Sequence, residues 1–145
     1  MKQDYLRKIF GRKILSVAGL SEIGVSKNVN QDAFRMGISE ENNLAYIIVA
    51  DGLGSCRYSD QGAERIVDII ERWILDKLPG YSYLNDSVAH TLENRILQEW
   101  NASYSPEEIY DYDTTVHAAV FYKGSILVGG IGDGMALIKI GDLVH

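Results

Sequence analysis

Three aspartates occupy positions where an expected strand meets a glycine-rich or polar turn. Asp32 lies in NQDAF, Asp51 in VADGLGS and Asp133 in GGIGDGMA. Carboxylate oxygens, together with a free backbone carbonyl, are the ligands that hard divalent cations take. Asp-Gly is also common turn chemistry, so a structural role stays open for each motif alone. Asp51 favours the metal interpretation, because it closes an apolar run that should lie deep inside the fold.

Other chemistries fit the sequence less well. The stretch GGIGDG invites a nucleotide-loop interpretation, but no helix pattern follows it to place a helix N-terminus at a phosphate. Cys56 lacks the arginine of a Cys-x5-Arg phosphate loop, and His90, His117 and His145 show no ligand spacing. His117 is expected to be a packed or surface residue of a strand. The sequence therefore favours divalent-metal chemistry over thiol or phosphate-loop chemistry.

The composition excludes several classes of protein. The 145 residues include 14 Lys and Arg against 20 Asp and Glu, a net charge of −6. This balance argues against a nucleic-acid surface but suits a site that collects cations. One cysteine fits a reducing compartment, and no stretch reaches the roughly 18 apolar residues of a membrane span, so we expect a cytoplasmic protein. Residues 1–13 have no apolar core that would make a secretory signal; they are interpreted as a terminal turn or, alternatively, a basic amphipathic anchor.

The elements that must position the three acids follow from hydrophobic periodicity. Strands are predicted over 14–20, 32–39, 44–50, 114–122, 125–131 and 135–140. Between the third and fourth, a helix capped by Ser59 or Asp60 is expected to run to a stop at 79–80, and a second, capped by Asn85 or Asp86, to run to about 100. A short helix could start at 105–108. Strands, two helices and then strands indicate an α+β fold with a largely antiparallel sheet.

Four motifs, in this order and spacing, resemble those of the metal-dependent (type 2C, PPM-type) protein serine/threonine phosphatases. They are NQDAF, VADGLGS, DTTVHAAVF and LVGGIGDGMALI. In the family, the first contains Glu-Asp-Ala, the second Val-Ala-Asp-Gly, the third Gly-Ser-Thr-Ala and the fourth Val-Gly-Asp. The resemblance covers about residues 14–140. It implies the N-terminal portion of an antiparallel β-sandwich flanked by helices (αββα), with hydrolysis of phosphoserine or phosphothreonine in a phosphoprotein substrate.

The resemblance implies a role for each matching position. Asp51 resembles the carboxylate that bridges two Mg²⁺ or Mn²⁺ ions, and Gly52 would lend its carbonyl oxygen to one of them. Asp32 resembles the acid that contacts metal-bound water, and Asp133 the acid beside a third metal position. The implied reaction is hydrolysis by a water that the metals activate, without a phosphoenzyme.

Some positions depart from the family pattern. Gln31 replaces a metal-binding glutamate, and its amide could offer an oxygen but no charge. A similar first motif occurs in a bacterial branch of the family, which points to bacterial signalling. Lys27 replaces the arginine that grips substrate phosphate, so it keeps the charge but loses the bidentate fork. Thr114 and Thr115 are expected to serve strand packing only.

The length of the chain is a further departure. The family domain is longer and has two more metal-binding aspartates in its C-terminal half; Asp142 has the context of a turn instead. We therefore expect residues 1–145 to form a single incomplete domain, with self-association through exposed sheet surface. A catalytically inactive binding or regulatory module on the same fold is the alternative, and an unrelated α+β domain whose Asp-Gly pairs are turns is the third.

Overall fold

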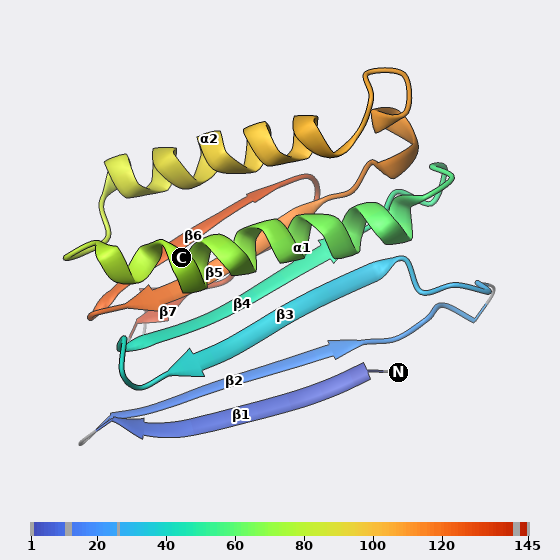
Figure 1. Cartoon of the computed structure of the whole chain (residues 1–145). Helices are drawn as coiled ribbons and strands as arrows, with labels where there is room; N and C mark the ends of the chain where they lie inside the picture. The colour runs from blue at the N-terminus through green and yellow to red at the C-terminus, as the bar shows by residue number, and fades with distance from the viewer. Residues whose placement is uncertain (1, 11–12, 26, 141–142, 145) are drawn as a thin grey trace.

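The computed structural model describes residues 2–10, 13–25, 27–140 and 143–144 (Figure 1). Helices α1 (Ser59–Asp76) and α2 (Asp86–Ser103) lie in the middle of the chain, with the short 3-10 helices η1 (Leu78–Gly80) and η2 (Ile109–Tyr112). The strands are β1 (Lys2–Phe10), β2 (Lys13–Ser21), β3 (Asp32–Ser39), β4 (Leu44–Asp51), β5 (Val116–Tyr122), β6 (Ser125–Ile131), β7 (Lys139–Ile140) and β8 (Leu143–Val144). All their pairings are antiparallel, so the predicted α+β class is confirmed.

The centre of the molecule is a four-stranded sheet with the order β3-β4-β5-β6. Side chains alternate between its two faces, and one face of β4 carries Leu44, Tyr46, Ile48 and Ala50, all at most 5% exposed. Helix α1 lies across this face and contacts β3, β4 and β5, as Figure 1 shows. The core therefore forms between the apolar stripe of α1 and the matching face of the sheet.

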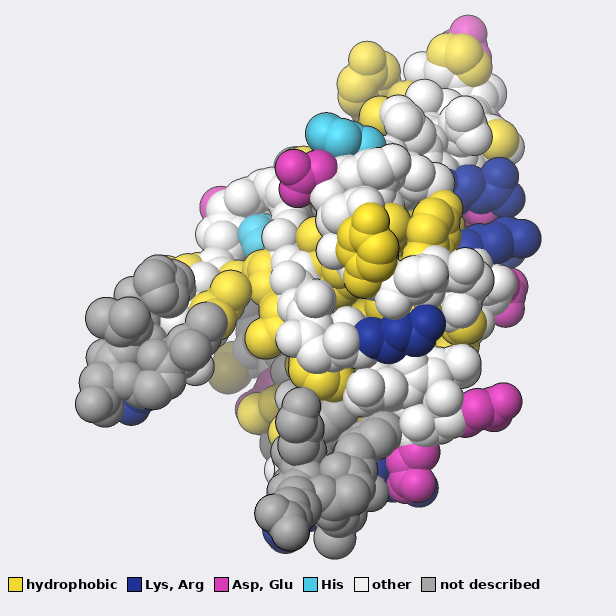
Figure 2. Space-filling model, turned by 90° about the vertical axis from the view of Figure 1, so that its left-hand side faces the viewer, with side chains coloured by type: hydrophobic (Ala, Val, Ile, Leu, Met, Phe, Trp, Pro, Cys, Tyr) yellow, Lys and Arg dark blue, Asp and Glu magenta, His cyan; other side chains and the backbone are white. Residues whose placement is uncertain are grey.

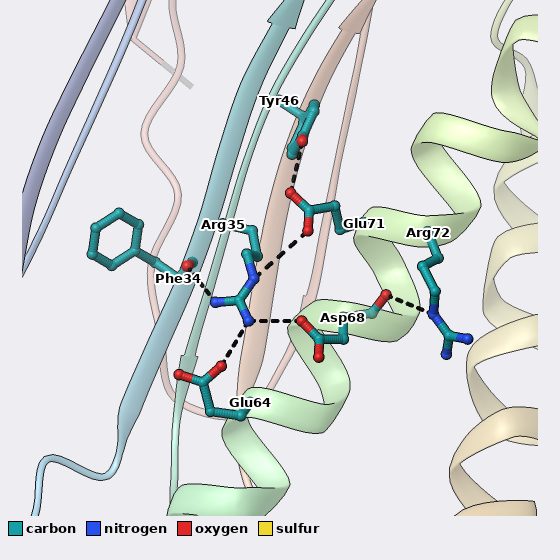
Figure 3. A network of polar contacts seen from close by, with 7 residues as sticks. All are labelled: Phe34, Arg35, Tyr46, Glu64, Asp68, Glu71 and Arg72. Carbon is teal, nitrogen blue, oxygen red and sulfur yellow. Dashed lines mark hydrogen bonds and ion pairs between the residues drawn. The ribbon is translucent and has the colours of Figure 1, made fainter.

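An arginine on β3 ties the sheet to α1 (Figure 3). One guanidinium nitrogen of Arg35 donates to Glu64 and to Asp68, both at 2.7 Å, and its Nε lies 3.6 Å from Glu71. Glu71 in turn accepts a hydrogen bond from the hydroxyl of Tyr46. Successive turns of the helix thus face one cation, which sets the position of α1 along the strand that begins at Asp32.

The other face of the sheet is partly covered by the β1–β2 hairpin. Phe34 points to this face, since its neighbour Arg35 points to α1, and a Cβ on Gly19 of β2 would lie 2.6 Å from the Phe34 ring. The N-terminal segment is therefore a strand that begins a second layer. The prediction of a terminal turn or amphipathic anchor was wrong, because residues 2–10 pair along their whole length with β2.

Helix boundaries were predicted well and their caps less well. Asn85 caps α2, its side chain accepting a hydrogen bond from Val88 N at 2.9 Å. Helix α1 instead has Tyr58 at its N-cap, without a side-chain cap, while Ser59 is fully buried. Residues 105–108 form a turn before η2, and of the strand predicted over 135–140 only Lys139–Ile140 forms.

Within the described part of the chain, neither long helix combines the length and apolar character that crossing a lipid bilayer requires.

An apolar groove of about 390 Å³ lies between α2 and the strands β5 and β6, of which β6 is the edge strand. Helix α2 packs on α1, and Ile96, Leu97, Leu127 and Ile131 line the space that is left. Ile131 is 64% exposed and Leu97 56%.

The end of the molecule at the left of Figure 1, seen in Figure 2, has hydrophobic side chains interspersed with charged ones of both signs.

Candidate functional site

The candidate site is built on two aspartates that face each other where β3 begins and β4 ends. Asp32 and Asp51 are directly paired in the antiparallel register, so their side chains lie on the same face, away from α1. The pKa of the Asp51 carboxyl is raised by burial, by a hydrogen bond with the Asp32 carboxylate, and by the charges of Asp32 and Asp133. The charge of Lys27 opposes this rise. The two carboxylates therefore favour sharing a proton or a cation.

A polar cavity of about 440 Å³ opens over this pair. Lys27, Gln31, Gly52 and Asp133 all contribute to its lining, so every site residue predicted from the sequence lies around one cavity. Asp133 follows the end of β6, on a loop that starts with Gly132 at a positive φ of 102°. This loop approaches β5 closely, where a Cβ on Gly134 would meet the His117 ring. The ring of His117 is packed against this loop, which is one of the two positions that the sequence left open for it.

Gly52 fills a position that has no room for a side chain. A Cβ on it would lie 2.5 Å from the carbonyl oxygen of Ser59 and 2.8 Å from that of Gln31. Its amide donates to the Gln31 carbonyl oxygen at 3.0 Å, which joins the end of β4 to the residue before β3. Glycine is therefore needed for the turn to pass between α1 and β3 while Asp51 stays beside Asp32.

Gln31 is the centre of a chain of three side chains. Its Oε1 accepts from Lys27 Nζ at 2.7 Å, and its Nε2 donates to Ser59 Oγ at 2.7 Å. The Lys27 ammonium lies over the turn that follows β4, since a Cβ on Gly54 would be 2.9 Å from Nζ. Both hydrogen-bonding ends of the Gln31 amide are thus engaged within the protein.

Hydrogen bonds from residues that were not predicted to serve the site hold the aspartates in place. The Asp51 carbonyl oxygen accepts from Thr115 N at 2.8 Å and from Thr114 Oγ1 at 2.9 Å. Asp32 Oδ2 accepts from Ser21 Oγ at 3.3 Å, and Ser21 itself accepts from Asn30. The threonines thus do more than pack the strand. The polar run at 113–115 was the signal available in the sequence for the two threonines. No local pattern in the sequence indicates a role for Ser21.

The carboxylates that the described residues place around the cavity are too few for a binuclear metal centre. Asp32 and Asp51 supply two carboxylates, and among the described residues no hydrogen bond reaches the Gly52 carbonyl oxygen. In the part of the chain that the structure describes, no group of three or more His, Cys, Asp and Glu side chains is arranged to hold a metal ion. Asp133 acts on Asp51 through its charge without completing such a group. Asp142 lies outside the described residues.

Comparison with known protein families yields a match over most of the chain. Residues 19–144 match the family model described as protein phosphatase 2C. No curated protein and no solved structure was found to match the chain. The matched segment begins in β2 and runs through β8, so it contains the whole four-stranded sheet, both long helices and the cavity.

Proposed function

Because the chain belongs to the protein phosphatase 2C family, we propose that it is part of a metal-dependent protein serine/threonine phosphatase. Its substrate would be a phosphoserine or phosphothreonine of a phosphoprotein, in the cytoplasm. The observation that supports this function is the Asp32–Asp51 pair, which faces a polar cavity with the pKa of Asp51 raised. Such a pair attracts a cation, because the cation removes the repulsion between two like charges.

The proposal assigns a role to each residue around the cavity. Asp51 and the Gly52 carbonyl oxygen would hold Mg²⁺ or Mn²⁺, and Asp32 would accept a hydrogen bond from water above the pair. Lys27 would face the phosphoryl oxygens, and Asp133 would add negative charge at the rim of the cavity. A bound divalent cation lowers the pKa of water and offsets the charge of the phosphoryl group. Thr114 and Thr115 keep the Asp51 backbone in register with Asp32.

We further propose that residues 1–145 belong to a larger catalytic domain. Two facing carboxylates are fewer than a binuclear site needs, and the groove between α2 and β6 leaves apolar side chains exposed. Additional chain would supply further acids to the cavity, and a separate segment would cover this groove, because the acid pair lies on the face of the sheet away from α1. Without such cover, the exposed surface of β6 favours self-association.

Calorimetric titration of Mn²⁺ into the wild type and into Asp51→Asn tests the metal site. We expect weak, saturable binding to the wild type and a loss of about tenfold or more in Asp51→Asn, since one of two carboxylates is removed. The variant Asp4→Asn, at an exposed position on β1, is the matched control. Equal binding by the wild type and Asp51→Asn would refute the proposed role of Asp51.

A catalytically inactive regulatory module is the second candidate, and the Lys27–Gln31 hydrogen bond favours it. An ammonium and a neutral amide stand beside the acid pair, which reduces the attraction of the cavity for a divalent cation. We expect the 145-residue chain to show little Mn²⁺-dependent hydrolysis of p-nitrophenyl phosphate. Robust turnover that Asp51→Asn abolishes would favour the enzyme over this alternative.

A further inference from the structure

We infer that Gln31 is a positioning residue, which holds the Lys27 ammonium over the 52–54 turn as a built-in cation of the cavity, and that it is not a metal ligand. This inference rests on the proposed function for the use of the cavity. Its own support is a chain of two short hydrogen bonds that runs from Lys27 through Gln31 to the start of α1.

The orientation of the Gln31 amide follows from its partners. A lysine ammonium can only donate, so the atom of Gln31 that faces Nζ at 2.7 Å must be the carbonyl oxygen. The amide nitrogen then faces Ser59 Oγ, which can accept. The opposite orientation would place two donors against each other, so the two contacts together define a single arrangement.

Ser59 gives this arrangement a rigid anchor. It is fully buried at the first residue of α1, and its backbone carbonyl packs against Gly52. Helix α1 is tied to β3 by Arg35. A side chain bonded to Ser59 is therefore fixed relative to both strands that carry the acid pair.

The engaged amide oxygen is a poor position for a divalent cation. A metal bound to the remaining lone pair of Oε1 would lie about 2.0–2.6 Å from that oxygen. It would then be roughly 4 Å from the Lys27 ammonium, a distance at which the two positive charges repel each other. The Lys27 charge already opposes the rise in the pKa of Asp51, so it acts on the same carboxylate pair that would hold the metal. Lys27 and a metal ion therefore compete for the same carboxylates.

Two substitutions distinguish a positioning residue from a ligand by the direction of their effect on Mn²⁺ binding. Lys27→Met should bind Mn²⁺ about fivefold more tightly, because a competing charge is removed. Gln31→Met, which keeps the length but not the amide, should bind at least as tightly as the wild type, since the released ammonium leaves the turn. Gln98→Met, at an exposed position on α2, is the matched control for the substitution itself.

The ammonium group supplies a readout that needs no metal. In ¹H–¹⁵N spectra of the lysine ammonium groups recorded with a chelator, a Lys27 ammonium held by Gln31 exchanges slowly with water. The Lys27→Met variant identifies its resonance. We expect that resonance to be lost in Gln31→Met and in Ser59→Ala, and retained in Gln98→Met. A thermal melt of each variant checks that it is folded.

Weaker Mn²⁺ binding by Gln31→Met would show that the amide oxygen is a ligand and would overturn the inference. A Lys27 ammonium resonance that is absent from the folded wild type, or unchanged in folded Gln31→Met, would also overturn it. If no variant binds Mn²⁺ while the resonance behaves as expected, the proposed metal site fails and the positioning role of Gln31 stands.

Discussion

Removing the charge of Asp51 should make the protein more stable at neutral pH. Asp51 faces Asp32 across the β3–β4 pair, and its pKa is raised by burial, by its hydrogen bond with Asp32 and by the charges of Asp32 and Asp133. The folded protein therefore resists ionisation of this group. In Asp51→Asn the amide occupies the place of the protonated carboxyl, donates to Asp32 and carries no charge.

The size of this effect follows from the repulsion between two neighbouring carboxylates. Unit charges about 4 Å apart repel by about 1 kcal/mol in water and about 4 kcal/mol near a protein surface. Asp51 is exposed on one side, and Lys27 offsets part of its charge, so the lower figure applies. A gain of about 1 kcal/mol corresponds to a rise in Tm of about 3 °C for a chain of this length.

The gain should depend on pH in a defined direction. A group whose pKa is higher in the folded than in the unfolded state stabilises the fold at low pH, and that contribution is lost as the pH rises through the folded pKa. The difference between Asp51→Asn and the wild type should therefore be largest at pH 7. It should vanish below the ordinary carboxyl pKa of 3.8, where Asp51 is protonated in both states.

Thermal unfolding followed by circular dichroism from pH 3 to pH 8, with a chelator present, measures this difference. The chelator is needed because a cation bound by the wild type would hide the repulsion. Asp4→Asn, at an exposed aspartate on β1, should show no comparable rise. In the double variant Asp32→Asn/Asp51→Asn, the second substitution should add less than the first, since the two charges act on each other. A gain of equal size at pH 4 and pH 7, or no gain at either, would refute the argument.

Three further results are expected from other parts of the fold. Gly62→Ala should lower the free energy of unfolding by at least about 2 kcal/mol in a urea titration, because a Cβ there would collide with the backbone of Tyr112; near-wild-type stability would show that η2 can move aside. Arg35→Met should cost about 2 kcal/mol in the same assay, since three acids of α1 lose their shared cation, and an unchanged midpoint would argue against this role. Ile126→Lys, at an exposed position of the edge strand β6, should shift any self-association seen by sedimentation velocity toward the monomer; an unaltered distribution of oligomers would exclude this edge as the contact.

The stability argument has a functional consequence. A protein gains nothing for its fold by holding two carboxylates together at the end of a buried strand, and residues that cost stability in this way are typical of functional sites. The raised pKa of Asp51 therefore supports the same conclusion as the cavity above it. Because the charge of Lys27 opposes this rise, we expect Lys27 to lower the affinity of the pair for a metal ion.

Local sequence determined most of the secondary structure of this protein. The apolar run 44–50 became β4, the helical spacing after residue 59 became α1, and the Lys123–Gly124 turn between two β-rich segments became the β5–β6 hairpin. These predictions succeeded because each depends on periodicity and turn chemistry within a few residues. The order of the motifs also identified the family. By contrast, strand β1 was missed, because its stability comes from pairing with β2 and not from a pattern of its own.

The sequence by itself placed acids at strand ends and so named Asp32, Asp51 and Asp133 as candidates. Only the tertiary structure decided that the first two face each other in register, that Thr114 and Thr115 bind the backbone of Asp51, and that Gln31 is engaged by Lys27 and Ser59. Ser59 and Gln31 are 28 residues apart, and Thr114 and Asp51 are 63 apart. Contacts over such separations depend on how helices and strands pack, which no local pattern of residues encodes.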